Sequence, residues 1–184
     1  MTQIKINYEY EVLLLLLKKE MHGRELTKEL KTSLTRVQAI LNELRQINVL
    51  DYKTEGKNHI YFIKKNLVAK SFILNAENYK LAKLLGKYPL FEPLFKEITE
   101  KYPDKMIVLF GSYAKFIPKN ESDIDIYIDT MDKNIKEKVQ LLNDLLSVKI
   151  GNFDSNDLLI KEIITNHIII QGAEKFYENL RFFK

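Results

Sequence analysis

The spacing of apolar residues changes along the chain, and each spacing predicts a different kind of element. Between residues 34 and 46 apolar side chains return every third or fourth position, which is the period of an amphipathic helix. Between residues 122 and 129 they return at every second position, which is the period of a strand with one buried face. The chain is therefore expected to combine helices and strands in a mixed α+β arrangement.

The first 65 residues predict three helices followed by a β-hairpin. The helices are expected at 8–20, 24–30 and 34–46, and the strands at 49–54 and 60–63. Ser33 stands at the N-cap position of the third helix. This order of elements resembles a winged helix-turn-helix domain, and the resemblance implies that the third helix lies in the major groove of DNA.

The same resemblance implies a set of contacts to duplex DNA. They are Thr35, Arg36, Gln38 and Asn42 on the third helix, and Lys53 and Lys57 on the hairpin, beside the phosphate backbone. Residues 1–65 hold 12 Lys and Arg against 8 Asp and Glu, whereas residues 66–184 hold 17 of each, so the whole basic surplus lies here. Such domains also mediate protein contacts, and Glu43 and Asp51 dilute the basic face, so a protein partner is the alternative.

The remainder of the chain predicts a connector and a second domain. Residues 66–88 predict a helical connector without a flexible linker. Beyond it, helices are expected at 90–102, 134–146, 156–166 and 173–180, and strands at 105–110, 122–128, 147–154 and 167–170. The expected domains are therefore 1–65, 66–88 and 89–184.

Two short motifs in the last half of the chain carry chemistry. Gly111-Ser112 follows an apolar run, and Asp123 and Asp125 lie in the alternating strand. Two carboxylates two residues apart on a strand lie roughly 6.5 Å apart at Cα and point the same way. Because Asp is disfavoured in strands, a pair flanked by three Ile indicates a function, and its geometry suits a divalent cation better than a solvated surface.

Gly111-Ser112 and Asp123-x-Asp125 at this spacing resemble the minimal nucleotidyltransferases of the DNA polymerase β-like superfamily. The resemblance implies a mixed sheet with helices mainly on one face. It also implies Mg²⁺-dependent transfer of a nucleoside monophosphate, with AMP from ATP as the expected case. By this resemblance Gly111, Ser112 and Lys115 bind the triphosphate, while Asp123 and Asp125 are catalytic and hold the metal.

Two features depart from the pattern of that family. The family commonly has Gly where this chain has Phe116, so the loop after Lys115 is expected to run differently. The family's third carboxylate lies on a following strand, where strand parity places Lys149 at the outward position and Asp154 among the inward ones. Either Asp154 serves as the third catalytic acid, through a bulge at Gly151 or because the strand ends before it, or the third acid is missing.

Composition excludes some kinds of site and indicates a cellular location for the protein. The chain of 184 residues has no Cys, which excludes disulfides and thiolate metal sites. It has no apolar run of 18 residues and no signal-peptide layout at its beginning, so no membrane contact and a cytoplasmic location are expected. Its three His share no metal-ligand spacing, and we expect them to be structural or exposed.

The sequence leaves two functions open. In the first, the protein is a nucleotidyltransferase, and its resemblance to antitoxins of the family implies a tyrosine of a HEPN-type toxin as the acceptor. In the second, it is a DNA-binding transcriptional regulator whose nucleotidyltransferase domain binds nucleotide but is catalytically degenerate, which Phe116 and Lys149 favour. A purely structural module would leave both motifs unexplained, and a homodimer is compatible with either function.

Overall fold

The computed structural model describes residues 5–183, and these fold into two compact units. The first unit comprises Lys5–Tyr79 together with Phe182 and Phe183, and the second comprises Lys80–Arg181. The division falls inside one long helix, α4 (Leu67–Lys87). Residues 1–4 and 184, which the predicted terminal domains include, lie outside the described residues.

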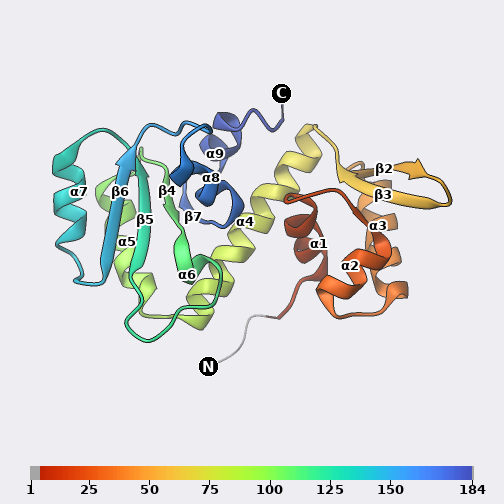
Figure 1. Ribbon diagram of the computed structural model, residues 1–184, viewed down its shortest axis with the longest axis horizontal. Helices are drawn as coiled ribbons and strands as arrows, with labels where there is room; N and C mark the ends of the chain where they lie inside the picture. Colours follow the sequence, from red (N-terminus) through yellow and green to blue (C-terminus); the bar gives the residue numbers. More distant parts are fainter. Residues whose placement is uncertain (1–4, 184) are drawn as a thin grey trace. The chain divides into compact units, whose positions relative to one another are not determined.

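The first unit is a winged helix-turn-helix built from short helices and a small sheet. Its elements in chain order are α1 (Tyr8–Leu16), β1 (Met21–His22), α2 (Gly23–Leu30), α3 (Leu34–Gln46), β2 (Leu50–Glu55) and β3 (Asn58–Ile63), followed by the beginning of α4. The sheet has the order β1-β3-β2 with both pairings antiparallel. Figure 1 shows β2 and β3 as the hairpin of this sheet. This arrangement confirms the fold expected from the sequence.

Helix α3 forms at the predicted residues because its N-cap and its apolar stripe mark the same segment of the chain. The hydroxyl of Ser33 accepts a hydrogen bond of 3.3 Å from the N–H of Arg36 and so caps the helix. The stripe that repeats every three to four residues is buried: Val37, Ile40, Leu41 and Leu44. The opposite side of α3 stays exposed and is free to contact a ligand.

The end of the first helix and the strand that follows it differ from the prediction. Helix α1 ends at Leu16 instead of continuing to residue 20, and the chain then forms the two-residue strand β1. In β1, Met21 pairs with Tyr61 and His22 pairs with Ile60 of β3. Such a short strand has no period of its own, so only its pairing with a distant segment defines it.

The second unit contains a four-stranded mixed sheet. After the end of α4 come α5 (Phe91–Lys101), β4 (Ile107–Leu109), α6 (Gly111–Ala114), β5 (Ile124–Asp129), α7 (Lys133–Gln140), β6 (Leu146–Gly151), α8 (Leu158–Thr165), β7 (Ile168–Gln171) and α9 (Ala173–Asn179). The strand order is β6-β5-β4-β7, in which β5 and β6 are parallel and the other two pairings are antiparallel (Figure 1). The mixed sheet confirms the expected α+β fold.

The alternation along β5 gives the sheet two different faces. Ile124, Ile126 and Ile128 are buried on one face, in a core that includes apolar residues of α5 and α7. On the other face Tyr127 is buried and its ring lies 6.3 Å from that of Phe153, measured between centroids. The second face is therefore covered at the middle of β5, while the beginning of the strand remains accessible.

Helices in this unit also differ in length from the prediction. Helix α7 ends at Gln140 instead of continuing to residue 146. The Gln140 side chain donates to the carbonyl of Leu146 and accepts a 3.0 Å hydrogen bond from the N–H of Val148. These bonds require the chain to turn back directly after the helix. In the region expected to be a helical connector, residues 66–88, α4 is one continuous helix. None of the described helices is long and apolar enough to cross a membrane.

Candidate active site

The two halves of the sequence motif contact each other directly. Gly111 begins α6 with a φ of 71°, a left-handed value that favours glycine. A Cβ atom at this position would lie 2.2 Å from Oδ2 of Asp125. The N–H of Phe110 also donates a 2.9 Å hydrogen bond to the carbonyl oxygen of Asp125. The turn after β4 is thus packed against the acidic strand so closely that only glycine fits.

Asp123 directly precedes β5 and Asp125 is its second residue, on the face opposite the buried Ile124 and Ile126. Asp123 is exposed and Asp125 is half-buried. Burial is the main reason that the pKa of Asp125 is raised above its ordinary value, and the negative charge of Asp123 raises it further. The site therefore concentrates negative charge at a place where a bound cation would relieve it.

The neighbouring strand β6 contributes two side chains beside the acidic pair. In the parallel register Asp125 pairs with Ser147, and Tyr127 pairs with Lys149. A hydrogen bond with the Ser147 side chain and the positive charge of Lys149 both lower the pKa of Asp125, against the larger effect of burial. The sequence correctly placed Lys149 on the side of the acidic pair, but it did not identify Ser147 as a partner of Asp125.

Asp154, expected as a possible third acid, is not brought to this site. Strand β6 ends at Gly151, and the chain then turns, with the exposed Asp154 accepting hydrogen bonds of 2.9 and 3.1 Å from the backbone and side chain of Asn156. Among residues 5–183 no three Asp, Glu, His or Cys side chains are close enough to hold one metal ion. Asp154 is thus bonded to Asn156 in the turn that follows β6.

A different carboxylate reaches the site from α8. Oε1 of Glu162 lies 3.2 Å from Nζ of Lys115, and its negative charge contributes to raising the pKa of Asp125. Ile160 and Ile163 are buried, which leaves Glu162 exposed on the outer side of the helix. No period or motif in the sequence distinguishes Glu162 from an ordinary surface residue, because only the packing of α8 brings it to Lys115.

The loop after Lys115 departs from the family pattern in a way that the structure explains. Phe116 adopts a φ of 59°, the left-handed conformation that glycine adopts more readily. Its ring lies 5.8 Å from Nζ of Lys83 and 5.6 Å from Nζ of Lys87, and Nζ of Lys87 donates a 3.3 Å hydrogen bond to its carbonyl. These contacts offset the backbone strain, and the N–H of Ile117 closes the turn with a 3.1 Å hydrogen bond to the carbonyl of Ser112.

The residues expected to contact DNA occupy the first unit. Thr35, Arg36, Gln38 and Asn42 are exposed on α3, and Lys57 is exposed in the loop between β2 and β3. The guanidinium of Arg36 lies 4.9 Å from the ring centroid of Tyr8, and the ammonium group of Lys53 forms an ion pair with Glu20. The four helix residues thus lie together on one element, whereas Lys53 already has a partner of opposite charge.

The acidic pair fits the chemistry of Mg²⁺. This ion binds oxygen ligands in an octahedron and is commonly held by one or two carboxylates, with substrate phosphates and water completing the shell. Asp123 and Asp125 supply the two carboxylates, and the close contact of Gly111 with Asp125 puts the Gly-Ser turn beside them. Ser112, half-buried in that turn, and the exposed Lys115 lie four residues or fewer from this contact.

Comparison with known proteins finds a family model, curated proteins and a solved structure that are similar to parts of this chain. A family model described as polymerase beta nucleotidyltransferase matches residues 95–180. Two proteins of Methanocaldococcus jannaschii, named "Putative protein adenylyltransferase MJ0126" and "Putative protein adenylyltransferase MJ1217", are each 37% identical over 84 residues, covering 44% of this chain and 80% of theirs. A crystal structure of a toxin-antitoxin with AMP-PNP aligns with a TM-score of 0.34 and 21% identity, covering 58% of this chain and 86% of that one.

Proposed function

Because the chain belongs to the minimal nucleotidyltransferases of the polymerase β-like family, we propose that it transfers AMP from Mg²⁺-bound ATP to an acceptor hydroxyl. The observation that carries this proposal is the contact between Gly111 and Asp125, where a Cβ atom would lie 2.2 Å from the carboxylate. This contact brings a turn that suits a phosphate group next to a carboxylate that suits a metal ion. The turn and the carboxylate can therefore bind the same nucleotide.

The side chains divide the binding of the nucleotide between them. Asp123 and Asp125 hold Mg²⁺, which supplies charge neutralisation for the triphosphate. Gly111 allows the backbone to approach a phosphate, and the Ser112 hydroxyl and the Lys115 ammonium group bind phosphate oxygens. Lys115 is paired with Glu162 at 3.2 Å, so it changes partners when the triphosphate binds. Alignment and electrostatic stabilisation account for most catalysis in phosphoryl chemistry.

The reaction needs an acceptor for one proton. The acceptor oxygen attacks the α-phosphorus, the bond from that phosphorus to the bridging oxygen breaks, and pyrophosphate leaves with the electron pair. The hydroxyl proton goes to the carboxylate of Glu162, which Lys115 releases when it turns to the triphosphate. Glu162 thereby takes the role that the family's third carboxylate would have on the strand carrying Lys149.

We place the acceptor hydroxyl on a tyrosine of a partner protein. Two relatives carry the words protein adenylyltransferase in their names, and the resemblance of the sequence to antitoxins suggests a HEPN-type toxin. In the same proposal, the winged helix binds duplex DNA through the exposed residues of α3. The exposed Thr35, Gln38 and Asn42 have side chains that hydrogen-bond to bases or phosphates.

A second candidate function rests on Lys149. Lys149 stands on the strand where the family has its third acid. In this second function the protein is a DNA-binding regulator that binds MgATP without transferring AMP. The two functions share the nucleotide site and differ only in transfer.

The binding step is tested with two isosteric variants of the same strand. Asp129 has the same parity on β5 as Asp125, but its carboxylate forms a 2.7 Å ion pair with Lys175. We expect Asp125→Asn to abolish the gain in ATP affinity that Mg²⁺ gives, measured by calorimetry, and Asp129→Asn to retain it. Equal Mg²⁺ dependence in Asp125→Asn and the unmodified protein would exclude the acidic pair as the metal site.

A further inference from the structure

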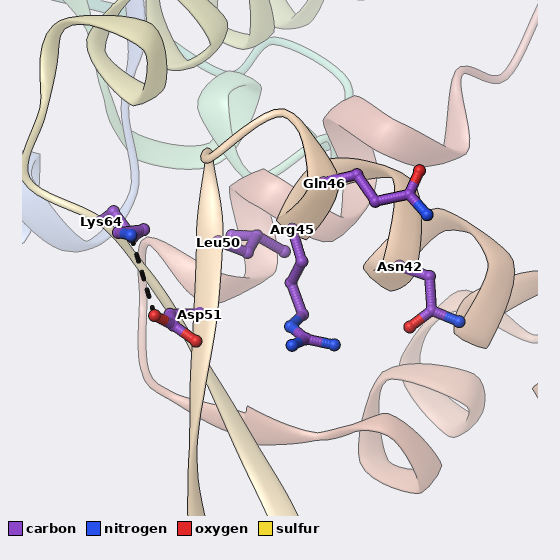
Figure 2. Close-up of a pocket in the computed structure, with 6 residues that line it drawn as sticks. All are labelled: Asn42, Arg45, Gln46, Leu50, Asp51 and Lys64. Carbon is purple, nitrogen blue, oxygen red and sulfur yellow. Dashed lines mark ion pairs between the residues drawn. The ribbon is translucent and has the colours of Figure 1, made fainter.

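A polar hollow lies on the first unit, outside the nucleotide site. It has a volume of about 350 Å³ and lies between the end of α3 and the beginning of the hairpin. Its lining residues are Asn42, Arg45, Gln46, Leu50, Asp51 and Lys64. Figure 2 shows the Arg45 side chain extending from α3 into this space, with Asn42 and Gln46 from the same helix beside it. We call it the Arg45 hollow.

Arg45 is held in place but lacks part of its hydrogen bonding. Its guanidinium carbon lies 4.3 Å from the ring centroid of Tyr52 on β2, a cation–π contact that fixes the plane of the group. Its Nε atom is buried and has no hydrogen-bond partner among the described residues. A buried donor without an acceptor is unfavourable, so the protein leaves part of the hydrogen-bonding capacity of this guanidinium unsatisfied.

The charges around the hollow leave Arg45 uncompensated. Asp51 is the acid among the lining residues, and its carboxylate lies 3.8 Å from Nζ of Lys64, an ion pair that Figure 2 marks with a dashed line. The same carboxylate accepts a 2.9 Å hydrogen bond from the N–H of Tyr52. With Asp51 and Lys64 balancing each other, the lining carries one net positive charge, on Arg45. The ligand that matches this lining is an anion.

Two amide side chains in the lining of the hollow suit the oxygens of a phosphate group. The amide groups of Asn42 and Gln46 lie one helical turn apart and flank Arg45 on the same helix. A guanidinium offers N–H groups in a planar fork that bind two phosphate oxygens at once. We propose that the Arg45 hollow binds a phosphate group.

The phosphate has two possible sources with the same chemistry. Arg45 follows Thr35, Gln38 and Asn42 at spacings of three, four and three residues, so all four share one side of α3. A phosphate of the DNA backbone would therefore reach Arg45 when α3 enters the groove, and that source rests on the DNA binding proposed above. A free phosphate or phosphate-bearing metabolite would bind without DNA and would not depend on it.

The test compares Arg45→Gln with a matched loss of charge elsewhere. Lys96→Gln removes one positive charge from an exposed position on α5 of the second unit. The affinity of the full chain for duplex DNA is measured over a range of salt concentrations. If the phosphate belongs to DNA, Arg45→Gln lowers the magnitude of the slope of log affinity against log salt by about one, and Lys96→Gln leaves it unchanged.

A second titration separates the two sources. Inorganic phosphate is added without DNA, and binding is followed through the Nε–H signal of Arg45 in NMR spectra. A shift of that signal that saturates, lost in Arg45→Gln, supports a free anion as ligand even where the protein binds no DNA. Arg45→Lys keeps the charge and shows by its unfolding temperature whether the fold survives without the fork. An unchanged salt slope in Arg45→Gln together with no response to phosphate would overturn the proposal.

Discussion

At the scale of single residues, Gly111 is the position on which the geometry of the site depends most. Its φ of 71° and its contact with Asp125 make it the one position where the phosphate turn and the acidic strand meet. The sequence could predict the importance of Gly111, Ser112, Asp123 and Asp125, because their types and spacing recur in a known family. It could not show that two of them are in contact, since the pairing of β4 with β5 determines that.

We predict that Gly111→Ala abolishes Mg²⁺-dependent ATP binding and destabilises the fold. The left-handed backbone costs an alanine about 1–2 kcal/mol, and the new methyl group requires Asp125 to move as well. Thermal unfolding and calorimetry measure the two effects. Gly151→Ala is the matched control, because Gly151 has no positive φ and a Cβ there would meet no atom within 4 Å. Undiminished Mg²⁺-dependent affinity in Gly111→Ala would contradict the geometry described for the site.

Two side chains at the site could not be identified from the sequence, and they share one property. Ser147 and Glu162 reach Asp125 and Lys115 from elements that follow the motif along the chain. Neither belongs to a spacing pattern, and each side chain is of a type common on surfaces. Only the register of β6 and the packing of α8 place them at the site.

At the scale of elements, α8 brings the carboxylate of Glu162 to Lys115. Its N-cap, Asp157, accepts a 2.7 Å hydrogen bond from the N–H of Leu159, and its buried face fixes the direction of Glu162. Exposed ion pairs contribute little to stability, about 0–1 kcal/mol, so the pairing of Lys115 with Glu162 does not by itself stabilise the fold. The role proposed for this ion pair is in the transfer reaction.

We predict that Glu162→Gln lowers the turnover number by a factor on the order of 100 or more, because general-base catalysis contributes 10²–10⁴-fold. The affinity for ATP should stay the same or rise, since a negative charge beside the triphosphate is removed. Steady-state kinetics separates the two effects, and Glu162→Asp should recover part of the turnover.

The control for this experiment is Glu100→Gln, an exposed acid on α5 that pairs with Lys96 at 3.8 Å. It should leave both quantities unchanged. If Glu162→Gln has the turnover number of the unmodified protein, Glu162 is only a surface partner of Lys115.

Element boundaries show where sequence patterns stop being informative. The limits of α3 were predicted correctly because a cap and an apolar stripe mark the same residues. Helix α7 ends early because the Gln140 side chain bonds to the backbone of β6, a contact that no local pattern reveals. Strand β1 is defined entirely by its partner.

At the scale of the whole molecule, the chain joins a winged helix to a nucleotidyltransferase unit. The basic surplus of residues 1–65 favours an anionic ligand, whereas the acidic pair at 123 and 125 favours a cation. In the proposed function the first unit binds an anionic polymer and the second binds a nucleotide through a cation. The fold of both units could be predicted from the order of their elements, whereas the acceptor leaves no mark on a single sequence.

The proposed transfer of AMP by this protein is tested most directly with labelled ATP. The full chain is incubated with Mg²⁺ and an extract of the cells that produce it, once with ATP labelled at the α-phosphate and once at the γ-phosphate. We predict that α-label, and no γ-label, becomes attached to a protease-sensitive acceptor beyond the labelling seen in the same extract with Asp125→Asn. Binding of MgATP without attachment of α-label to any acceptor would contradict it and favour the nucleotide-binding regulator.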